Sequence, residues 1–255
     1  MDKLLKNRAA IITGGARGMG RAIALRFAEE GASSCIADVL DKDGADTVKM
    51  VKARGVDCMY VHTDVTSAAS VKAMVAKAIE HYGKVELMAN CAGIGRPPMP
   101  ITEISEEEYD KVVDVNMKGI FLCCQAMTDH LKANQYGKVI NICSLAGVSP
   151  TPVSIHYAVA KAGAIHISNC FAKVVAKDHV TVNAILPGMI RTDMTRDFAP
   201  PVIKDLDAFM AKLTEGVPLG REGQVEDIAS TALFLASDLS SYITGEAIAV
   251  GGGMH

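Results

Sequence analysis

Short apolar runs alternate with longer stretches of helical spacing along most of the 255-residue chain. Several of the runs are continuously apolar, which is typical of parallel strands covered on both faces. We predict strands at 9–13, 34–38, 57–62, 85–89, 138–144, 181–186 and 247–250. The stretches between them predict helices, including 68–82, 106–134, 154–177 and 225–237. Strict alternation of the two element types predicts an α/β fold with a mainly parallel sheet.

The first predicted strand runs into a glycine-rich turn, with glycines at 14, 18 and 20, and a helical stretch over 21–30 follows. Such glycines let the backbone approach a pyrophosphate, and the helix N-terminus then points its amides at that anion. An ordinary glycine turn is the alternative, but strand, turn and helix occur in the order that dinucleotide binding requires. The second predicted strand ends at Asp38, where a carboxylate is placed to accept hydrogen bonds from an adenosine ribose.

Tyr157 and Lys161 are four residues apart, so they share one face of the predicted helix. An ammonium near a phenol favours the phenolate, which would let a group with an ordinary pKa of about 10 exchange protons nearer neutrality. The hydroxyl of Ser144 could hydrogen-bond the reacting oxygen. Taken alone, such a pair is more often a half-buried tyrosine near a solvated lysine. The other motifs of the chain are what favour a role in proton transfer.

The chain resembles the short-chain dehydrogenase/reductase family over essentially its whole length. The resemblance is carried, in the family's order, by Thr13-Gly-Gly-Ala-Arg-Gly-Met-Gly20, Asn90-Cys-Ala-Gly93, Asn116, Ser144, Tyr157-x-x-x-Lys161 and Pro187-Gly188. It implies a single Rossmann-type domain over 1–255, with a doubly wound, mainly parallel sheet of seven strands and helices on both faces. It also implies hydride exchange between an alcohol and a carbonyl, with a nicotinamide cofactor.

Residue roles follow from the resemblance motif by motif. Tyr157 is implied to be the acid/base, and Lys161 to lower its pKa and hold the nicotinamide ribose. Ser144 would orient the substrate oxygen, and Asn116 would keep a proton-relay water in place. Tyr157 and Lys161 also count among the residues implied to bind cofactor, together with Gly14, Arg17, Gly18, Met19, Gly20, Asp38, Asp64, Val65, Asn90, Ala92, Gly93, Pro187, Gly188, Ile190 and Thr192.

Some of these positions have a structural alternative or depart from the family pattern. Asp64 or Thr66 could instead cap a helix N-terminus, and Asn116 could be a generic surface asparagine. Cys91 stands where the family often has asparagine, and we expect a mild effect because the backbone turn can still form. Gly251 replaces the usual aspartate near the C-terminus, which affects the contacts expected of the last strand.

Asp38 favours NAD over NADP as cofactor, because a 2′-phosphate would meet a like charge. Arg17 is the opposing feature, since it could reach toward such a phosphate. The leading prediction is an NAD-dependent dehydrogenase or reductase for a small-molecule secondary alcohol or ketone, apolar or cyclic and hydroxysteroid-like. The presumed substrate-side loops are apolar, with Ile94, Met99, Met189, Met194, Phe198, Phe209 and Met210, although Arg96, Arg191 and Arg196 could hold an acidic group. Two alternatives are an NADP-dependent 3-oxoacyl-carrier reductase and a non-catalytic dinucleotide sensor.

Composition and residue spacing bear on the binding partners, the compartment and the metal content of the protein. The net charge of −3 and the scattered basic residues favour neither a nucleic-acid nor a membrane surface. We expect no membrane span and no signal peptide, and we expect seven reduced cysteines in a cytoplasmic protein. Histidine and cysteine spacings predict no metal site. The stretch 189–216 is predicted to be an irregular, mobile lid, and the family implies a homotetramer built through the helices at 106–134 and 154–177.

Overall fold

One parallel sheet organises the computed structural model, which describes residues 3–192, 194–200 and 202–254. Its strands are β1 (Ala9–Thr13), β2 (Ser33–Asp38), β3 (Cys58–His62), β4 (Leu87–Asn90), β5 (Gly137–Ile142), β6 (Val180–Pro187) and β7 (Ala247–Val250). They pair in the order β3-β2-β1-β4-β5-β6-β7, and each pairing is parallel. The strand order reverses between β1 and β4, where open α/β sheets place their ligands. The predicted doubly wound α/β fold with seven strands is confirmed.

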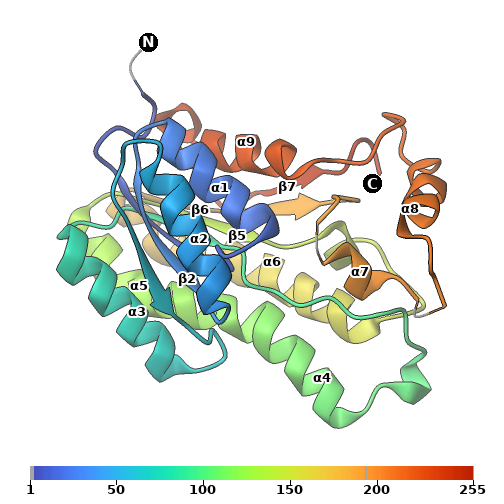
Figure 1. Ribbon diagram of the computed structural model, residues 1–255. Coiled ribbons are helices and arrows are strands. Elements are labelled where there is room, and N and C mark those ends of the chain that lie inside the picture. The colour runs from blue at the N-terminus through green and yellow to red at the C-terminus, as the bar shows by residue number, and fades with distance from the viewer. Residues whose placement is uncertain (1–2, 193, 201, 255) are drawn as a thin grey trace.

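Helices cover both faces of this sheet (Figure 1). One face packs against α1 (Gly18–Glu29), α2 (Asp41–Lys52) and α9 (Val225–Ala236). The other face packs against α3 (Ala68–Tyr82), α5 (Gly119–Asn134) and α6 (Ile155–Val175). Neighbouring residues Ile11 and Ile12 of β1 point to opposite faces and are both fully buried, because side chains alternate along a strand.

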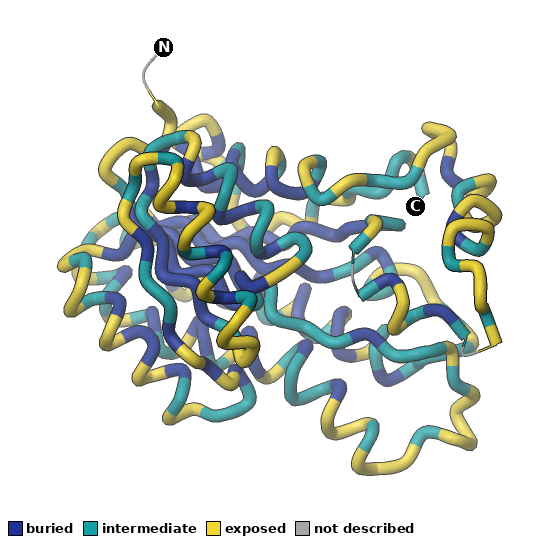
Figure 2. Tube along the Cα trace, viewed as in Figure 1, coloured by how far each residue is buried: buried dark blue, intermediate teal, exposed yellow. Residues whose placement is uncertain are grey.

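The central sheet is buried, whereas the outer helix faces and the segment around α8 are exposed to solvent. Figure 2 shows the inner strands of the sheet in dark blue, whereas the outward faces of the helices are largely yellow. The segment around α8 (Leu206–Thr214) lies beyond the carboxyl ends of the strands and is largely exposed. None of the described helices combines the length and the hydropathy that crossing a bilayer requires.

Several predicted boundaries match the structure, among them β1, β7 and α3. The predicted helix at 106–134 is helical over its whole length, and a π turn, Asp114–Lys118, lies within it between α4 (Glu106–Val113) and α5. The predicted helix at 154–177 stops earlier, and a 3-10 turn, Ala176–Asp178, follows α6. The stretch at 189–216 is less irregular than predicted, since it contains α7 (Thr195–Phe198) and α8. Residues 193 and 201 of that stretch lie outside the described residues.

Candidate active site

The glycine turn after β1 brings three backbone segments into close contact. Gly14 has a φ of +64°, and a Cβ there would lie 2.6 Å from the Ala92 nitrogen. A Cβ on Gly20, at the start of α1, would overlap the Gly14 carbonyl oxygen. Gly18 also has a positive φ, +50°. These positions require glycine, because a side chain would push apart β1, the segment after β4 and α1.

A cavity of about 750 Å³ opens at this carboxyl edge of the sheet, within the size range of small-molecule sites. Its wall includes most of the residues predicted to bind cofactor: Gly14, Arg17, Gly18, Met19, Gly20, Asp38, Asp64, Val65, Ala92, Gly93 and Thr192. Two further wall residues, Ile94 and Met194, were predicted to lie on substrate-side loops. The rest of the wall had no predicted binding role: Ala37, Val39, Leu40, Thr63, Thr66, Cys91, Lys111, Asp114, Val115 and Asp197. Val39 and Leu40, which are exposed apolar residues directly after Asp38, were the signal available for that part of the wall.

Asp38 is held by backbone amides on either side of the cavity. Its Oδ2 accepts a hydrogen bond from the Ala16 nitrogen at 3.0 Å, and its Oδ1 accepts one from the Leu40 nitrogen at 3.1 Å. A carboxylate offers about four lone-pair positions, so both oxygens keep further acceptor capacity. The position predicted from the strand end is therefore confirmed, and the carboxylate is fixed in orientation.

Asp64 supports its own turn and does not cap α3. Its Oδ1 accepts hydrogen bonds from the nitrogen and hydroxyl of Thr66, at 2.9 and 2.7 Å. The N-cap of α3 is Ser67, whose hydroxyl accepts from the Ser70 nitrogen at 3.3 Å. The alternative of an N-cap at Asp64 or Thr66 is wrong, and Asp64 remains part of the cavity wall.

Helix α6 places Tyr157 and Lys161 side by side behind the cavity. The Lys161 ammonium donates to the Ile142 carbonyl at 3.0 Å and lies 5.8 Å from the centre of the Tyr157 ring. Burial lowers the pKa of Lys161. Desolvation raises the pKa of Tyr157 to about 12, and a hydrogen bond with the Ser144 hydroxyl acts in the opposite direction. In this arrangement desolvation outweighs the Ser144 hydrogen bond, so the phenol is neutral near pH 7, and the effect of Lys161 on the tyrosine pKa stays a prediction.

Ser144 follows β5 and starts the 3-10 turn Leu145–Gly147. Its hydroxyl oxygen accepts from the Ala146 nitrogen at 3.1 Å, which fixes the side chain beside the Tyr157 phenol. A Cβ on Gly147 would lie 2.8 Å from the Lys161 carbonyl carbon. The turn thus packs directly on α6. The proximity of the Ser144 and Tyr157 hydroxyls depends on that close contact.

Asn116 lies within the π turn and is fully buried, so the alternative of a surface asparagine is wrong. Its side-chain nitrogen donates to the carbonyls of Ile94 and Val112, both at 3.0 Å, and its oxygen accepts from the Ile94 nitrogen at 3.3 Å. A Cβ on Gly93 would lie 2.9 Å from the Asn116 oxygen and 3.6 Å from the Lys161 nitrogen. Gly93 therefore connects the cavity wall to Asn116 and Lys161.

The structure places six predicted cofactor contacts outside the cavity wall: Asn90, Tyr157, Lys161, Pro187, Gly188 and Ile190. The Asn90 side chain is buried and donates to the Asn141 oxygen at 2.7 Å. The Asn90-to-Gly93 turn is held by Thr13, whose hydroxyl oxygen accepts from the nitrogens of Cys91 and Ala92 at 3.2 and 3.3 Å. That turn forms with a cysteine at position 91, as expected.

The C-terminal glycines pack against the segment that follows Ser144. A Cβ on Gly251 would lie 2.5 Å from Leu145 Cδ1, and a Cβ on Gly188 would lie 2.7 Å from the Gly251 Cα. The aspartate that the family often has at position 251 would collide with Leu145 in this arrangement. The glycine that replaces aspartate at position 251 therefore goes with a local difference in packing next to the Ser144 and Tyr157 hydroxyls.

The segment at 189–216 contacts Tyr157 through an aromatic ring. The rings of Phe198, at the end of α7, and Tyr157 meet edge to face, with centroids 5.2 Å apart and an interplanar angle of 76°. A Cβ on Gly95 would lie 2.7 Å from the Phe198 ring, so the ring fills the space beside that glycine. The substrate side of Tyr157 is thereby bounded by an apolar ring.

Comparisons with known proteins agree with this geometry. A family model described as Enoyl-(Acyl carrier protein) reductase matches residues 14–255. The 3-oxoacyl-(acyl-carrier-protein) reductase FabG of Staphylococcus epidermidis is 37% identical over 250 residues, which is 98% of this chain and 99% of the relative. The FabG of Chlamydia muridarum is 39% identical over 255 residues, which is 100% of both chains.

Two solved structures are similar over nearly the full length. Levodione reductase has a TM-score of 0.93 at 28% identity, covering 98% of each chain. A short-chain type dehydrogenase/reductase from Mycobacterium marinum has a TM-score of 0.89 at 30% identity, covering 98% of this chain and 96% of the other. Fold and matches together define a Rossmann-type oxidoreductase that acts on alcohol and carbonyl groups with a nicotinamide dinucleotide. The chain belongs to the short-chain dehydrogenase/reductase family, as its motifs predicted.

Proposed function

We propose that the protein is an NAD(H)-dependent reductase of 3-oxoacyl thioesters. The relatives named 3-oxoacyl-(acyl-carrier-protein) reductase span essentially all of this chain at 37–39% identity, which favours this substrate class over the hydroxysteroid-like alcohol preferred from the sequence. One domain over 1–255 with a lid at 189–216 remains our prediction.

The carboxylate of Asp38 carries the cofactor proposal. It is fixed between the Ala16 and Leu40 amides on the cavity wall, with acceptor capacity left for two ribose hydroxyls. A 2′-phosphate at that position would bring a second anion against a carboxylate and remove those hydrogen bonds. The close glycine turn and the cavity of about 750 Å³ fit a nicotinamide dinucleotide.

The proposed chemistry uses the protonated form of Tyr157. Because its pKa is raised to about 12, the phenol holds a proton near neutral pH and can donate it to the oxygen of a ketone being reduced. Ser144, which hydrogen-bonds the phenol, would orient that oxygen. Lys161 would hold a ribose, and Asn116 would keep a water in position between the loop after β4 and α6. The nicotinamide, when bound, supplies the hydride.

A second candidate substrate is an apolar cyclic ketone. Phe198 meets the Tyr157 ring edge to face and leaves an apolar wall on the side where a carbonyl would approach. The similarity to levodione reductase supports the same candidate. An extended 3-oxoacyl chain and a compact ring would make different contacts with this apolar wall. The two candidate substrates can therefore be distinguished by experiment.

We also propose a homotetramer in the cytoplasm. Exposed apolar side chains on α5 and α6 support association through these helices: Phe121, Val159 and Val174 are 47%, 46% and 56% exposed. Seven free thiols support a reducing compartment. Light scattering at micromolar concentration tests the assembly, and a monomeric mass would exclude it.

The proposed function is tested by following reduced nicotinamide at 340 nm. The substrates are an acetoacetyl thioester, a set of cyclic ketones and a set of polyols, each measured with NADH and with NADPH. We expect the highest kcat/KM for the thioester with NADH. A higher kcat/KM for a cyclic ketone would favour the second candidate, and a higher value with NADPH would overturn the interpretation of Asp38.

A further inference from the structure

An ion pair joins the glycine turn to α2 beside the adenosine end of the cavity. Arg17 Nη2 lies 2.8 Å from Asp43 Oδ2. Arg17 lines the cavity together with Asp38, and Asp43 lies in the first turn of α2. The hydrogen bond from Arg17 is the main reason why the pKa of Asp43 is lowered. The Arg17 guanidinium, which lines the cavity with Asp38, is thus engaged by a second carboxylate, that of Asp43.

Contacts further along α2 fix the backbone that carries the Asp43 carboxylate. The buried Thr47 hydroxyl lies 3.1 Å from the Ala16 and Asp43 carbonyl oxygens, and it accepts from Arg21 Nε at 2.9 Å. Arg21 in turn donates to the Ala16 and Asp43 carbonyls. The backbone at Asp43 is therefore tied directly to the glycine turn that carries Arg17.

The other side of α2 is tied to the end of β2. The Tyr60 ring packs against Gly44, where a Cβ would overlap it. The Tyr60 hydroxyl lies 2.6 Å from the Asp38 carbonyl and 2.8 Å from Asp41 Oδ1. The spacing between Asp38, Arg17 and Asp43 is consequently set by packing and hydrogen bonds on both sides of the helix.

We propose that Asp43 is a specificity-determining residue that disfavours NADP by holding Arg17 in this ion pair. This inference rests on the proposed dinucleotide site. A 2′-phosphate is recognised by a guanidinium that can present its paired donors to the phosphate oxygens. Asp43 competes for those donors. Asp38 acts on the ribose directly, whereas Asp43 acts through Arg17.

The test compares Asp43→Asn with Asp46→Asn. Asp46 lies on the same helix in an exposed ion pair with Lys49, at 2.9 Å, so its substitution makes the same charge change away from Arg17. Binding of NADH and NADPH is titrated by their fluorescence, and binding of 5′-AMP and 2′,5′-ADP by calorimetry. We expect Asp43→Asn to tighten NADPH and 2′,5′-ADP about three- to fivefold, the size of effect that one exposed ion pair produces, with NADH and 5′-AMP unchanged. Asp46→Asn should change none of the four affinities.

A second cycle places both substitutions in an Arg17→Gln background. We expect no tightening of NADPH there, because Asp43 acts through the guanidinium. The proposal is overturned if Asp43→Asn leaves NADPH affinity unchanged, if the gain persists with Arg17→Gln, or if Asp46→Asn gives an equal gain. Asp43→Ser serves as a second variant with the same expectation, should the asparagine fold poorly.

These outcomes are independent of which cofactor the wild-type protein prefers. If wild-type protein binds NADPH more tightly than NADH, the proposed NAD preference fails. The change in NADPH affinity on replacing Asp43 would still report whether Asp43 restrains Arg17. A failure of the Asp43 proposal leaves the contribution of Asp38 standing.

Discussion

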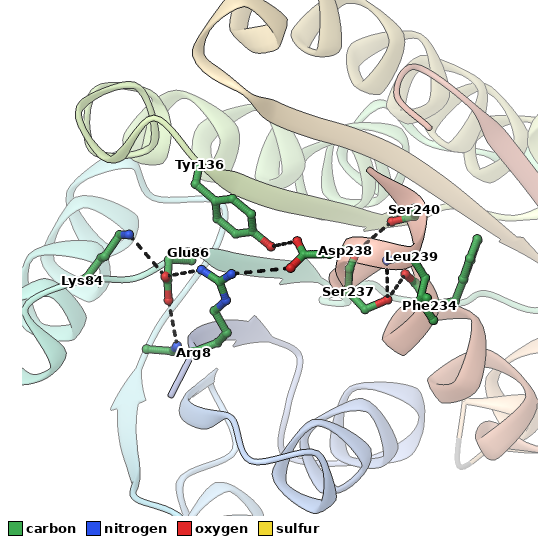
Figure 3. A network of polar contacts seen from close by, with 10 residues as sticks. Arg8, Lys84, Glu86, Tyr136, Phe234, Ser237, Asp238, Leu239 and Ser240 are labelled. Carbon is green, nitrogen blue, oxygen red and sulfur yellow. Dashed lines mark hydrogen bonds and ion pairs between the residues drawn. The ribbon is translucent and has the colours of Figure 1, made fainter. Parts of the chain in front are cut away.

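The two edges of the central sheet use polar side chains in opposite ways. At the amino edge, Arg8 pairs with Glu86 at 2.6 Å and stacks over the Tyr136 ring at 4.1 Å (Figure 3). Tyr136 donates to Asp238 at 2.8 Å, which links the starts of three strands to the turn after α9. These groups satisfy one another, so this edge contributes to holding the sheet together.

The carboxyl edge holds a buried ammonium and a buried amide oxygen that are incompletely paired. Lys161 is only 4% exposed, and its ammonium donates to a carbonyl, that of Ile142. The side-chain oxygen of Asn90 has no hydrogen-bond partner among the described residues. Because burial lowers the pKa of Lys161, charging it at neutral pH costs the folded state stability. The same sheet therefore carries a stabilising edge and an edge suited to a ligand.

The largest expected effect is that of Tyr157→Phe, which removes the proposed transferable proton. Turnover should fall by at least about 10²-fold, while NADH binding and Tm change little. Tyr136→Phe is the matched control at the amino edge, since it removes a phenol that bonds Asp238. Steady-state assays of both variants decide the point, and near-normal turnover of Tyr157→Phe would refute the assignment.

Lys161→Met should separate activity from stability at the carboxyl edge. We expect turnover to fall about 10²-fold and NADH to bind more weakly, because one ammonium serves both roles. Removing a desolvated charge favours the folded state, and the lost bond to Ile142 works against it, so Tm should not fall. Calorimetry beside the activity assay measures this, and a clear drop in Tm would contradict the comparison.

Glu86→Gln should give the reverse result at the amino edge. Breaking the Arg8 pair should cost about 2 kcal/mol, less than for a fully buried pair because the Arg8 side chain is 26% exposed. For a chain of this size that is a Tm lowered by about 4–8 °C, with turnover retained. Exposed Glu80→Gln is the control for loss of charge. Turnover that falls in parallel with Tm would show that the two edges are not separate.

The smallest expected effect concerns pH and His156, next to the candidate acid. His156 is fully buried, with Glu108 3.9 Å from its Nε2 and Arg96 beside that carboxylate. Burial lowers its pKa, so its stability contribution is complete above about pH 6.5 and is lost as pH falls through the lower folded value. His156→Gln should therefore lose less Tm than wild type between pH 7.5 and 5. Equal losses would show that another group governs acid stability.

The sequence was sufficient for the framework because its signals are local. Continuous apolar runs marked β1 and β7 at their observed bounds, and helical spacing marked α3. The glycine turn and Asp38 follow from the same local logic, since a strand end determines where the next residues lie. The family motifs placed Ser144, Tyr157 and Lys161, which the structure brings together.

The remainder depends on tertiary packing that periodicity does not reveal. The π turn at Asn116 adds one residue to a helix without changing its composition. The neutral Tyr157 results from desolvation, which raises its pKa more than the hydrogen bond with Ser144 lowers it. The Arg17–Asp43 pair joins residues from two elements, and only the packing of α2 brings them together.

The glycine at 251 has an evolutionary consequence. Since a Cβ there would lie 2.5 Å from Leu145 Cδ1, the aspartate of related sequences requires the Leu145 side chain to shift or position 145 to become smaller. We therefore expect the two positions to vary together among related chains, and a library that varies positions 145 and 251 together samples variants that single substitutions miss.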